Sequence, residues 1–248
     1  MEKLVYSIVS ANQSEDLLKK ALEKTAGIAG SRLYAVTSGQ IGVVFSDIER
    51  SGFSATQDTA LEYAGVIEEL SGEFNLLPVR FGSLMESTDS ISSMIEKNYP
   101  AIIENLSKVE NKLEFGLKVF CVTESIRELF REKAENQPSG STNQGEPSVY
   151  MDYVRKKLKE HRFEEMILAH VNNVGREITD HLALLNPLHK FKKMPSSSNL
   201  IDAVFLLEKT KTESIVEVVK QLQVRYPGFR FVLTGPWPPY SFVDITLK

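Results

Sequence analysis

The sequence predicts an α+β protein with two domains, each built as a β-α-β-β-α-β unit. The two halves of the 248-residue chain show the same order of strand-like and helix-like segments. Apolar residues alternate in the strand-like runs and recur every three or four positions in the helical runs. This order is typical of the ferredoxin-like (split βαβ) motif or a modified form of it, in which two helices cover one face of an antiparallel sheet. The chain length also fits two domains.

The first half contains four strand-like runs and two helical runs. An N-cap at Ser14 opens the first helical pattern, and the second follows Ser54. The polar residues 37–40 connect the second and third strands as a hairpin. In the fourth strand, Pro78 requires an edge position or a site with an unpaired donor, and Arg80 is expected to face away from Leu77, Val79 and Phe81. The expected strands are 4–10, 33–36, 41–45 and 76–82.

The second half begins with an alternating strand. Leu113, Phe115, Leu117, Val119 and Cys121 are expected on one face, and Glu114, Gly116 and Lys118 on the other. Before this strand, residues 87–110 are interpreted as a connecting helical pair, interrupted at Tyr99-Pro100. The expected elements after it are a helix at 149–185, strands at 188–193 and 201–208, a helix at 213–226 and a strand at 229–235.

These elements define the predicted domain organisation. Residues 135–148 are rich in Gly, Pro, Ser, Asn and Gln, which indicates a mobile loop. The predicted organisation is a first domain at 1–84, a helical connector at 85–111, a second domain at 112–233 containing the loop, and an extended C-terminal arm at 234–248.

Composition excludes several classes of function. A net charge of -4 argues against nucleic-acid binding, which normally shows as a basic excess. Cys121 is the only cysteine, so no intrachain disulfide can form and a cytoplasmic location fits best. The N-terminus lacks the pattern of a signal peptide. Apolar runs such as 203–207 are far shorter than the ~18 residues of a membrane span, so no membrane insertion is expected.

The sequence shows no catalytic constellation. It contains no GxGxxG, GxxxxGK[ST], GxSxG or HExxH pattern. His170 and His181 share a helix face but lie ~16 Å apart along its axis, too far for one metal ion. His161 faces away from His170, and Cys121 is expected to be a buried, inert thiol. We therefore predict a protein that is not an enzyme and has no cofactor or metal.

The C-terminal arm is unusual in composition. Three prolines, the only tryptophan and two further aromatic residues occur within nine positions, 234–242. Because proline fixes φ and donates no hydrogen bond, a stiff, extended arm is expected. One interpretation is that the arm folds back and plugs a groove between the domains with Trp237. The other is that its aromatic residues form part of a partner-binding surface.

Three motifs carry a resemblance to a known family. LLPVRFGSL at 76–84 (the first motif), LTGPWPPYSFV at 233–243 (the second motif) and the E-x-G-x-K-V pattern at 114–119 resemble signatures of the gas vesicle GvpL/GvpF family. The second motif is long and unusual enough to be specific, and the three together extend over nearly the whole chain. GvpF and GvpL proteins share these motifs, so the resemblance names the family alone.

The resemblance implies a non-catalytic gas vesicle protein, either a minor structural component or an assembly factor. It would contact the major gas vesicle shell protein (GvpA type) and other accessory proteins, and would be associated with the shell within the cytoplasm. An alternative from another class is a ferredoxin-like small-molecule sensor or enzyme that uses the interdomain cleft. The candidate interaction residues are Pro78, Arg80, Phe81, Gly82, Thr234, Gly235, Pro236, Trp237, Pro238, Pro239, Tyr240 and Phe242.

Overall fold

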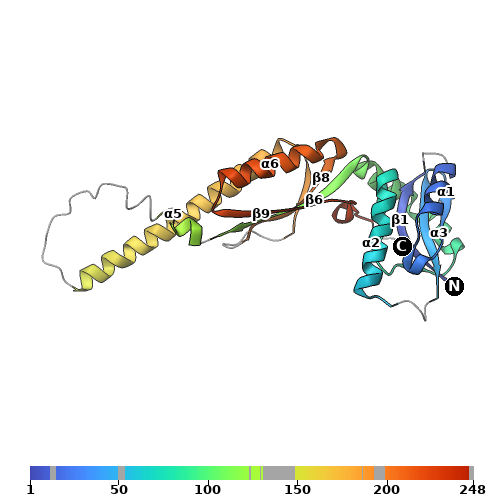
Figure 1. The fold of residues 1–248 in the computed structure, drawn as a ribbon, viewed down its shortest axis with the longest axis horizontal. Helices are drawn as coiled ribbons and strands as arrows, with labels where there is room; N and C mark the ends of the chain where they lie inside the picture. The colour runs from blue at the N-terminus through green and yellow to red at the C-terminus, as the bar shows by residue number, and fades with distance from the viewer. Residues whose placement is uncertain are drawn as a thin grey trace. The chain divides into compact units, whose positions relative to one another are not determined.

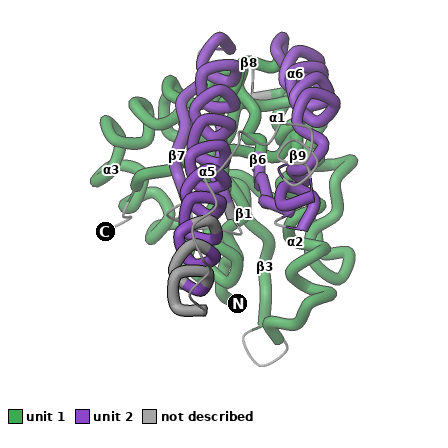
Figure 2. Tube along the Cα trace, turned by 90° about the vertical axis from the view of Figure 1, so that its left-hand side faces the viewer, with its two compact units in different colours: residues 1–115, 206–209, 235–248 green, residues 116–205, 210–234 purple. Residues whose placement is uncertain are grey.

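The computed structural model divides into two compact units, coloured separately in Figure 2. Unit 1 comprises residues 1–115, 206–209 and 235–248, and unit 2 comprises 116–205 and 210–234. The structure describes residues 1–11, 15–49, 54–122, 124–128, 130, 149–185, 187–192 and 199–245. The predicted loop at 135–148 lies outside these described residues.

Unit 1 is built on a five-stranded antiparallel sheet. Its strand order is β2-β3-β1-β4, and β5 pairs with β1 beside this path. The first strand in sequence is therefore central, between β3 and β4. The elements are β1 (Glu2–Ser10), α1 (Glu15–Lys24), β2 (Leu33–Ser38), β3 (Ile41–Ile48), α2 (Gln57–Glu73), β4 (Leu76–Pro78), β5 (Leu84–Met85) and α3 (Thr88–Val109). Figure 1 labels β1 and the three helices.

The two helices of the predicted β-α-β-β-α-β unit, α1 and α2, share one face of this sheet, and the helix of the predicted connector, α3, covers the other face. β1 and β3 each contain six consecutive buried residues, which is typical of strands packed on both sides. Tyr6 and Val44 pack with α1 and α2 on one face. α3 lies on the opposite side of β1 and β3 (Figure 2). Val43 and Phe45 alternate with Val44 and therefore face α3.

The expected connector is a single helix, α3, and not a helical pair. Ser87 caps its start by accepting a hydrogen bond from the Ser90 amide at 3.1 Å. Pro100 lies inside the helix but on its exposed side. Ile95 and Ile102, one on each side of the proline, are both fully buried. Packing of both halves therefore outweighs the backbone hydrogen bond that the proline cannot make.

Unit 2 contains most of a four-stranded sheet with the order β7-β8-β6-β9. Its first strand in sequence, β6, again lies between the third and the fourth. The predicted burial of Cys121 on β6 is confirmed. A stripe of buried residues on α5 packs in the unit's core: Ile167, Val171, Val174, Ile178 and Leu182. The elements are β6 (Lys112–Cys121), α5 (Val149–Ala183), β7 (Leu188–Phe191), β8 (Asn199–Glu208), α6 (Thr212–Arg225) and β9 (Phe229–Trp237).

The chain passes between the two units within strands. β6, β8 and β9 each contribute residues to both units. The predicted limits of independently folding domains, at 84, 111 and 233, stay predictions. None of the helices that the structure describes has a stretch that is apolar enough, over the necessary length, to cross a membrane.

Candidate interaction site

The first motif begins at an edge of the unit 1 sheet. β4 pairs with β1 through Leu76, Leu77 and Pro78, opposite Val9, Ile8 and Ser7. β4 is the last strand on this side of the sheet, so the edge position predicted for Pro78 is confirmed.

The motif then leaves the strand in a turn, whereas the sequence predicted a strand up to residue 82. The Val79 amide still donates to the Tyr6 carbonyl at 2.9 Å. After it, the amide and hydroxyl of Ser83 both donate to the Arg80 carbonyl, at 3.1 and 2.7 Å. Gly82 has a φ of 82°, which favours glycine and ends the extended conformation. The alternation expected for Arg80 and Phe81 therefore does not apply.

Tyr63 of α2 contacts this turn through both its hydroxyl and its ring. Its hydroxyl lies 2.9 Å from the Val79 carbonyl and 2.8 Å from the Val5 carbonyl. Its ring packs against Phe81, with 5.1 Å between the ring centroids, and stacks on Tyr6 at 4.9 Å. Burial raises the pKa of Tyr63 far above its usual value, so the phenol remains a hydrogen-bond donor.

The second motif starts as a strand, so the predicted arm is not a separate extended segment from residue 234. β9 continues to Trp237. Gly235 has a φ of 106°, and a Cβ there would lie 2.7 Å from the Glu114 carbonyl oxygen. This close approach of two backbones excludes larger residues. Thr234 belongs to unit 2, where its hydroxyl donates to the Gly116 carbonyl at 3.4 Å.

After β9 the chain folds into unit 1, but Trp237 is not the residue that packs inside. Trp237 is 45% exposed. Pro238 and Pro239 are buried and line a small cavity with Phe74, the residue that follows α2, and Phe242 is only 1% exposed. The interpretation of Trp237 as a plug is therefore wrong, because the two prolines and Phe242 take that role within unit 1.

Glu114 anchors the short helical turn Tyr240–Phe242 that follows. Its carboxylate accepts hydrogen bonds from the Ser241 amide at 2.7 Å and from the Ser241 hydroxyl at 2.6 Å. Glu114 is only 5% exposed, whereas alternation had placed it on the polar face of its strand. Two donors satisfy the charge, which allows the carboxylate to be buried.

The chain then reaches α3. The Asp244 amide donates to the Asn105 side-chain oxygen at 3.0 Å, and the Asp244 carboxylate forms an ion pair with Lys108 at 2.6 Å. Asn105 is 7% exposed, so the neighbouring residues restrict the position of its side chain. Residues 238–245 are thus attached to unit 1 at Glu114 and at α3.

Together, β4 and this C-terminal segment form a groove with a volume of about 670 Å³. Its lining is mainly apolar, with Arg80 as a cationic group at the edge. Partial burial, and then the negative charges of Glu68 and Glu114, raise the pKa of Tyr240 to about 12. The groove is lined by Ile8, Leu77, Pro78, Val79, Arg80, Ser83, Tyr240, Val243 and Ile245.

The groove brings residues of both motifs together, although they are distant in sequence. Pro78, Arg80 and Tyr240 line it, while Phe81 and Gly82 shape the turn beside it. The other predicted residues, Thr234, Gly235, Pro236, Trp237, Pro238, Pro239 and Phe242, are not among its lining residues.

Sequence reasoning missed the residues that hold the groove together. Tyr63 and Asn105 carried no signal, because each lies within an ordinary helical pattern. Glu114 lies in the E-x-G-x-K-V pattern and Ser241 lies in the second motif. Their positions in these motifs could have marked both as candidates.

The comparison with known families decides the identity. The sequence profile of the family "Gas vesicle synthesis protein GvpL/GvpF" matches residues 3–244. The chain belongs to the GvpL/GvpF family. The match includes both motifs and the Glu114 strand, so the groove and its anchor lie within the family's shared region.

Relatives of this GvpL/GvpF protein carry both family names. Gas vesicle protein L of Streptomyces sp. (strain CB03234) is 24% identical over 195 residues, which cover 76% of this chain and 70% of that protein. Gas vesicle protein F1 of Halobacterium salinarum is 20% identical over 224 residues, covering 88% and 85%. The role of the chain is therefore in gas vesicles, the structures that give cells buoyancy.

Solved structures of the family have the same fold. The crystal structure of the gas vesicle protein GvpF from Anabaena sp. PCC7120 matches with a TM-score of 0.73 at 15% identity, covering 99% of this chain and 97% of that one. GvpF from Microcystis aeruginosa matches with a TM-score of 0.70 at 14% identity, covering 98% and 99%. The mixed α and β architecture with antiparallel sheets is thus that of GvpF.

Proposed function

We propose that this protein is a non-catalytic gas vesicle protein that binds the major shell protein (GvpA type) through the groove between β4 and residues 238–245. The observation that carries this proposal is the meeting of both family motifs in one groove. Its apolar lining suits an apolar side chain of a partner, and Arg80 suits a carboxylate. Trp237 and Tyr240, 45% and 43% exposed, offer aromatic anchors nearby.

In this role the protein shields or positions shell subunits while a vesicle starts to grow, and it remains associated with the shell in the cytoplasm. A shell subunit that covers a gas space exposes apolar surface before assembly, and such surface aggregates in water. An apolar groove that covers part of that surface lowers this risk. Other gas vesicle accessory proteins are further partners in the proposal.

Co-purification of the shell protein tests the contact. Arg80→Glu and the double variant Trp237→Ala, Tyr240→Ala are compared with the wild-type chain, with circular dichroism as a check on folding. A matched control, Tyr153→Ala with Phe191→Ala, removes two exposed aromatic residues from unit 2. Loss of the shell protein only from the two groove variants supports the proposal. Equal retention by all folded variants contradicts it.

We also infer that both units derive from ferredoxin-like modules and that the second motif works as an interaction element. The support is the common strand order, in which the first strand lies between the third and fourth. A thermal-shift panel of metabolites and metals tests the alternative of a sensor or enzyme, because a ligand that binds only the folded state raises the melting temperature.

A further inference from the structure

The other edge of the unit 1 sheet is arranged differently from the β4 edge. β2 is the last strand there, and among the described strands it pairs only with β3. An isolated bridge between Ala26 and Arg32 closes just the start of this edge. Residues 238–245 lie beside the β4 edge, whereas a groove lies beside most of β2.

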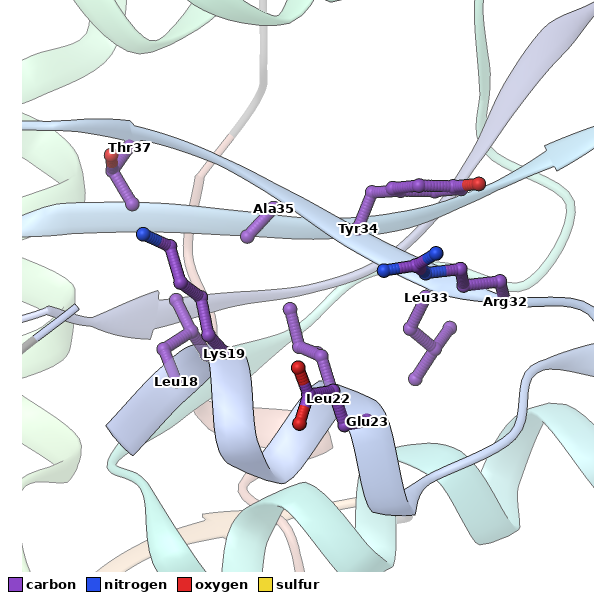
Figure 3. Close-up of a pocket in the computed structure, with 9 residues that line it drawn as sticks. All are labelled: Leu18, Lys19, Leu22, Glu23, Arg32, Leu33, Tyr34, Ala35 and Thr37. Atoms are coloured by element: carbon purple, nitrogen blue, oxygen red, sulfur yellow. The ribbon is translucent and has the colours of Figure 1, made fainter. Parts of the chain in front are cut away.

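This groove lies between β2 and α1 and has a volume of about 320 Å³ (Figure 3). Leu33, Ala35 and Thr37 occupy alternate positions of β2 and therefore share the face toward α1. Ala35 is the smallest of the three, and Leu18 and Leu22 of α1 lie opposite the strand. The short side chain in the middle of β2 leaves a hollow beside the edge, with apolar side chains from α1 on one side.

Two cations, Lys19 and Arg32, lie at the ends of this hollow, and one carboxylate, that of Glu23, also lines it. Figure 3 shows the Lys19 amine turned toward Thr37 at one end of β2, and Arg32 at the other end. The Arg32 guanidinium lies 5.5 Å from the centre of the Tyr34 ring, which steadies it. No described residue forms an ion pair with Lys19 or Arg32. From Leu33 to Thr37 a strand rises ~13 Å, so the two ends of the hollow face positions about four residues apart in a neighbouring strand.

We propose that this groove binds an extended acidic segment of a partner protein, which adds to β2 as a further strand. Main-chain hydrogen bonds to an open edge supply affinity, and side-chain pockets supply specificity. An apolar residue opposite Ala35 fills the hollow. Acidic residues two positions before and after it meet Lys19 and Arg32. The expected pattern, acidic-x-apolar-x-acidic, is the same in both chain directions.

The two cations have a simpler role if nothing binds here. Charged residues at an edge strand prevent two proteins from pairing edge to edge. If the cations have only that role, any difference in binding between acidic and basic peptides of the same shape follows from net charge alone. That role also requires no particular spacing of the charges. The proposal predicts both a charge preference and a spacing preference, so peptides separate the two roles.

The experiment measures binding of fluorescent peptides by anisotropy. The acidic probe is STETVTETS. One control, STKTVTKTS, reverses its charges, and another, STTEVETTS, moves the carboxylates to the opposite face of a strand. We expect the first peptide to bind about tenfold more tightly than either control. Lys19→Glu with Arg32→Glu should invert the preference for acidic over basic peptide.

Two further variants complete the test. Lys20→Glu with Lys24→Glu changes the net charge equally on α1 and should keep the wild-type preference, since neither residue lines the groove. Ala35→Leu should fill the hollow and weaken binding about tenfold in a protein with an unchanged circular dichroism spectrum. Equal binding of all peptides, or binding of none, overturns the proposal. Dimerisation of the chain that Ala35→Leu abolishes also overturns it, since the occupant is then a second copy. These outcomes are independent of shell-protein binding at the β4 groove.

Discussion

Ser241 donates two hydrogen bonds to Glu114, a buried residue 127 positions earlier in the chain. This pair attaches the second motif to the start of β6. The bonds also satisfy both carboxylate oxygens of a side chain that is almost inaccessible to water. The position of Tyr240 beside the β4 groove therefore depends on a contact between two side chains and not only on the direction of β9.

Ser241→Ala should lower the free energy of unfolding by about 1–3 kcal/mol. The variant loses one hydrogen bond to a buried charge, and the carboxylate oxygen is left without its donor. Urea denaturation measures the change, and hydrogen exchange should show weaker protection of residues 240–243. Ser92→Ala is the control, because the exposed Ser92 hydroxyl donates only within α3, and its effect should be within about 0.5 kcal/mol. Equal effects of the two variants would contradict the anchoring role.

Tyr63→Phe should destabilise unit 1 by about 1–3 kcal/mol while the ring packing is kept. The variant removes the hydroxyl that lies within hydrogen-bond distance of the Val5 and Val79 carbonyls, in a buried site. Denaturant unfolding of this variant is compared with that of Tyr34→Phe, whose residue is 39% exposed. An unchanged midpoint for Tyr63→Phe would show that the turn at Arg80–Ser83 does not need this anchor.

Alkaline pH should weaken the packing of Tyr240. Its pKa is raised from 10.0 to about 12 in the folded protein, chiefly by burial. A raised pKa means that the folded state holds the phenol proton more tightly, so this contribution to stability is complete below pH 10 and is lost between pH 10 and about 12. Unfolding curves across this range should fall less steeply for Tyr240→Phe than for the wild type. Tyr153→Phe is the control for removal of a phenol, and parallel curves for Tyr240→Phe and the wild type would refute the assignment.

The order of elements could be predicted from sequence because periodicity reports burial within one element. The alternation of Leu113 to Cys121 and the helical spacing in α5 have this origin. Periodicity does not report which distant groups satisfy a polar residue. Glu114 was therefore assigned to the polar face, although Ser241 makes its burial favourable. The same limitation concealed the turn at Gly82, since Arg80 and Phe81 fit an alternating pattern.

The candidate site was predictable in part for a related reason. The two motifs stood out by composition. Neither motif alone, however, predicts that Pro78 and Tyr240 line the same groove, because that depends on the tertiary structure. Pro78 could be placed at an edge because proline lacks a donor. One interpretation placed Trp237 in a groove, but β9 ends at this residue with the side chain exposed. The role of α3 could not be inferred, since an amphipathic helix fits either face of a sheet.

Substitution of two glycines by alanine should have opposite effects on stability. Gly235 has a φ of 106°, and an added Cβ would lie 2.7 Å from the Glu114 carbonyl oxygen, a backbone atom that cannot turn aside. Gly235→Ala should therefore cost about 1–3 kcal/mol and release the second motif from β6. Gly65 lies in α2 with nothing within 4 Å of an added Cβ, so Gly65→Ala should stabilise the protein by about 0.5–1 kcal/mol. Thermal and urea denaturation of both variants measure the two signs. A Gly235→Ala variant as stable as the wild type would mean that the two backbones can separate at this point. The second motif would then be held by the hydrogen bonds of Ser241 and by the packing of Pro238, Pro239 and Phe242.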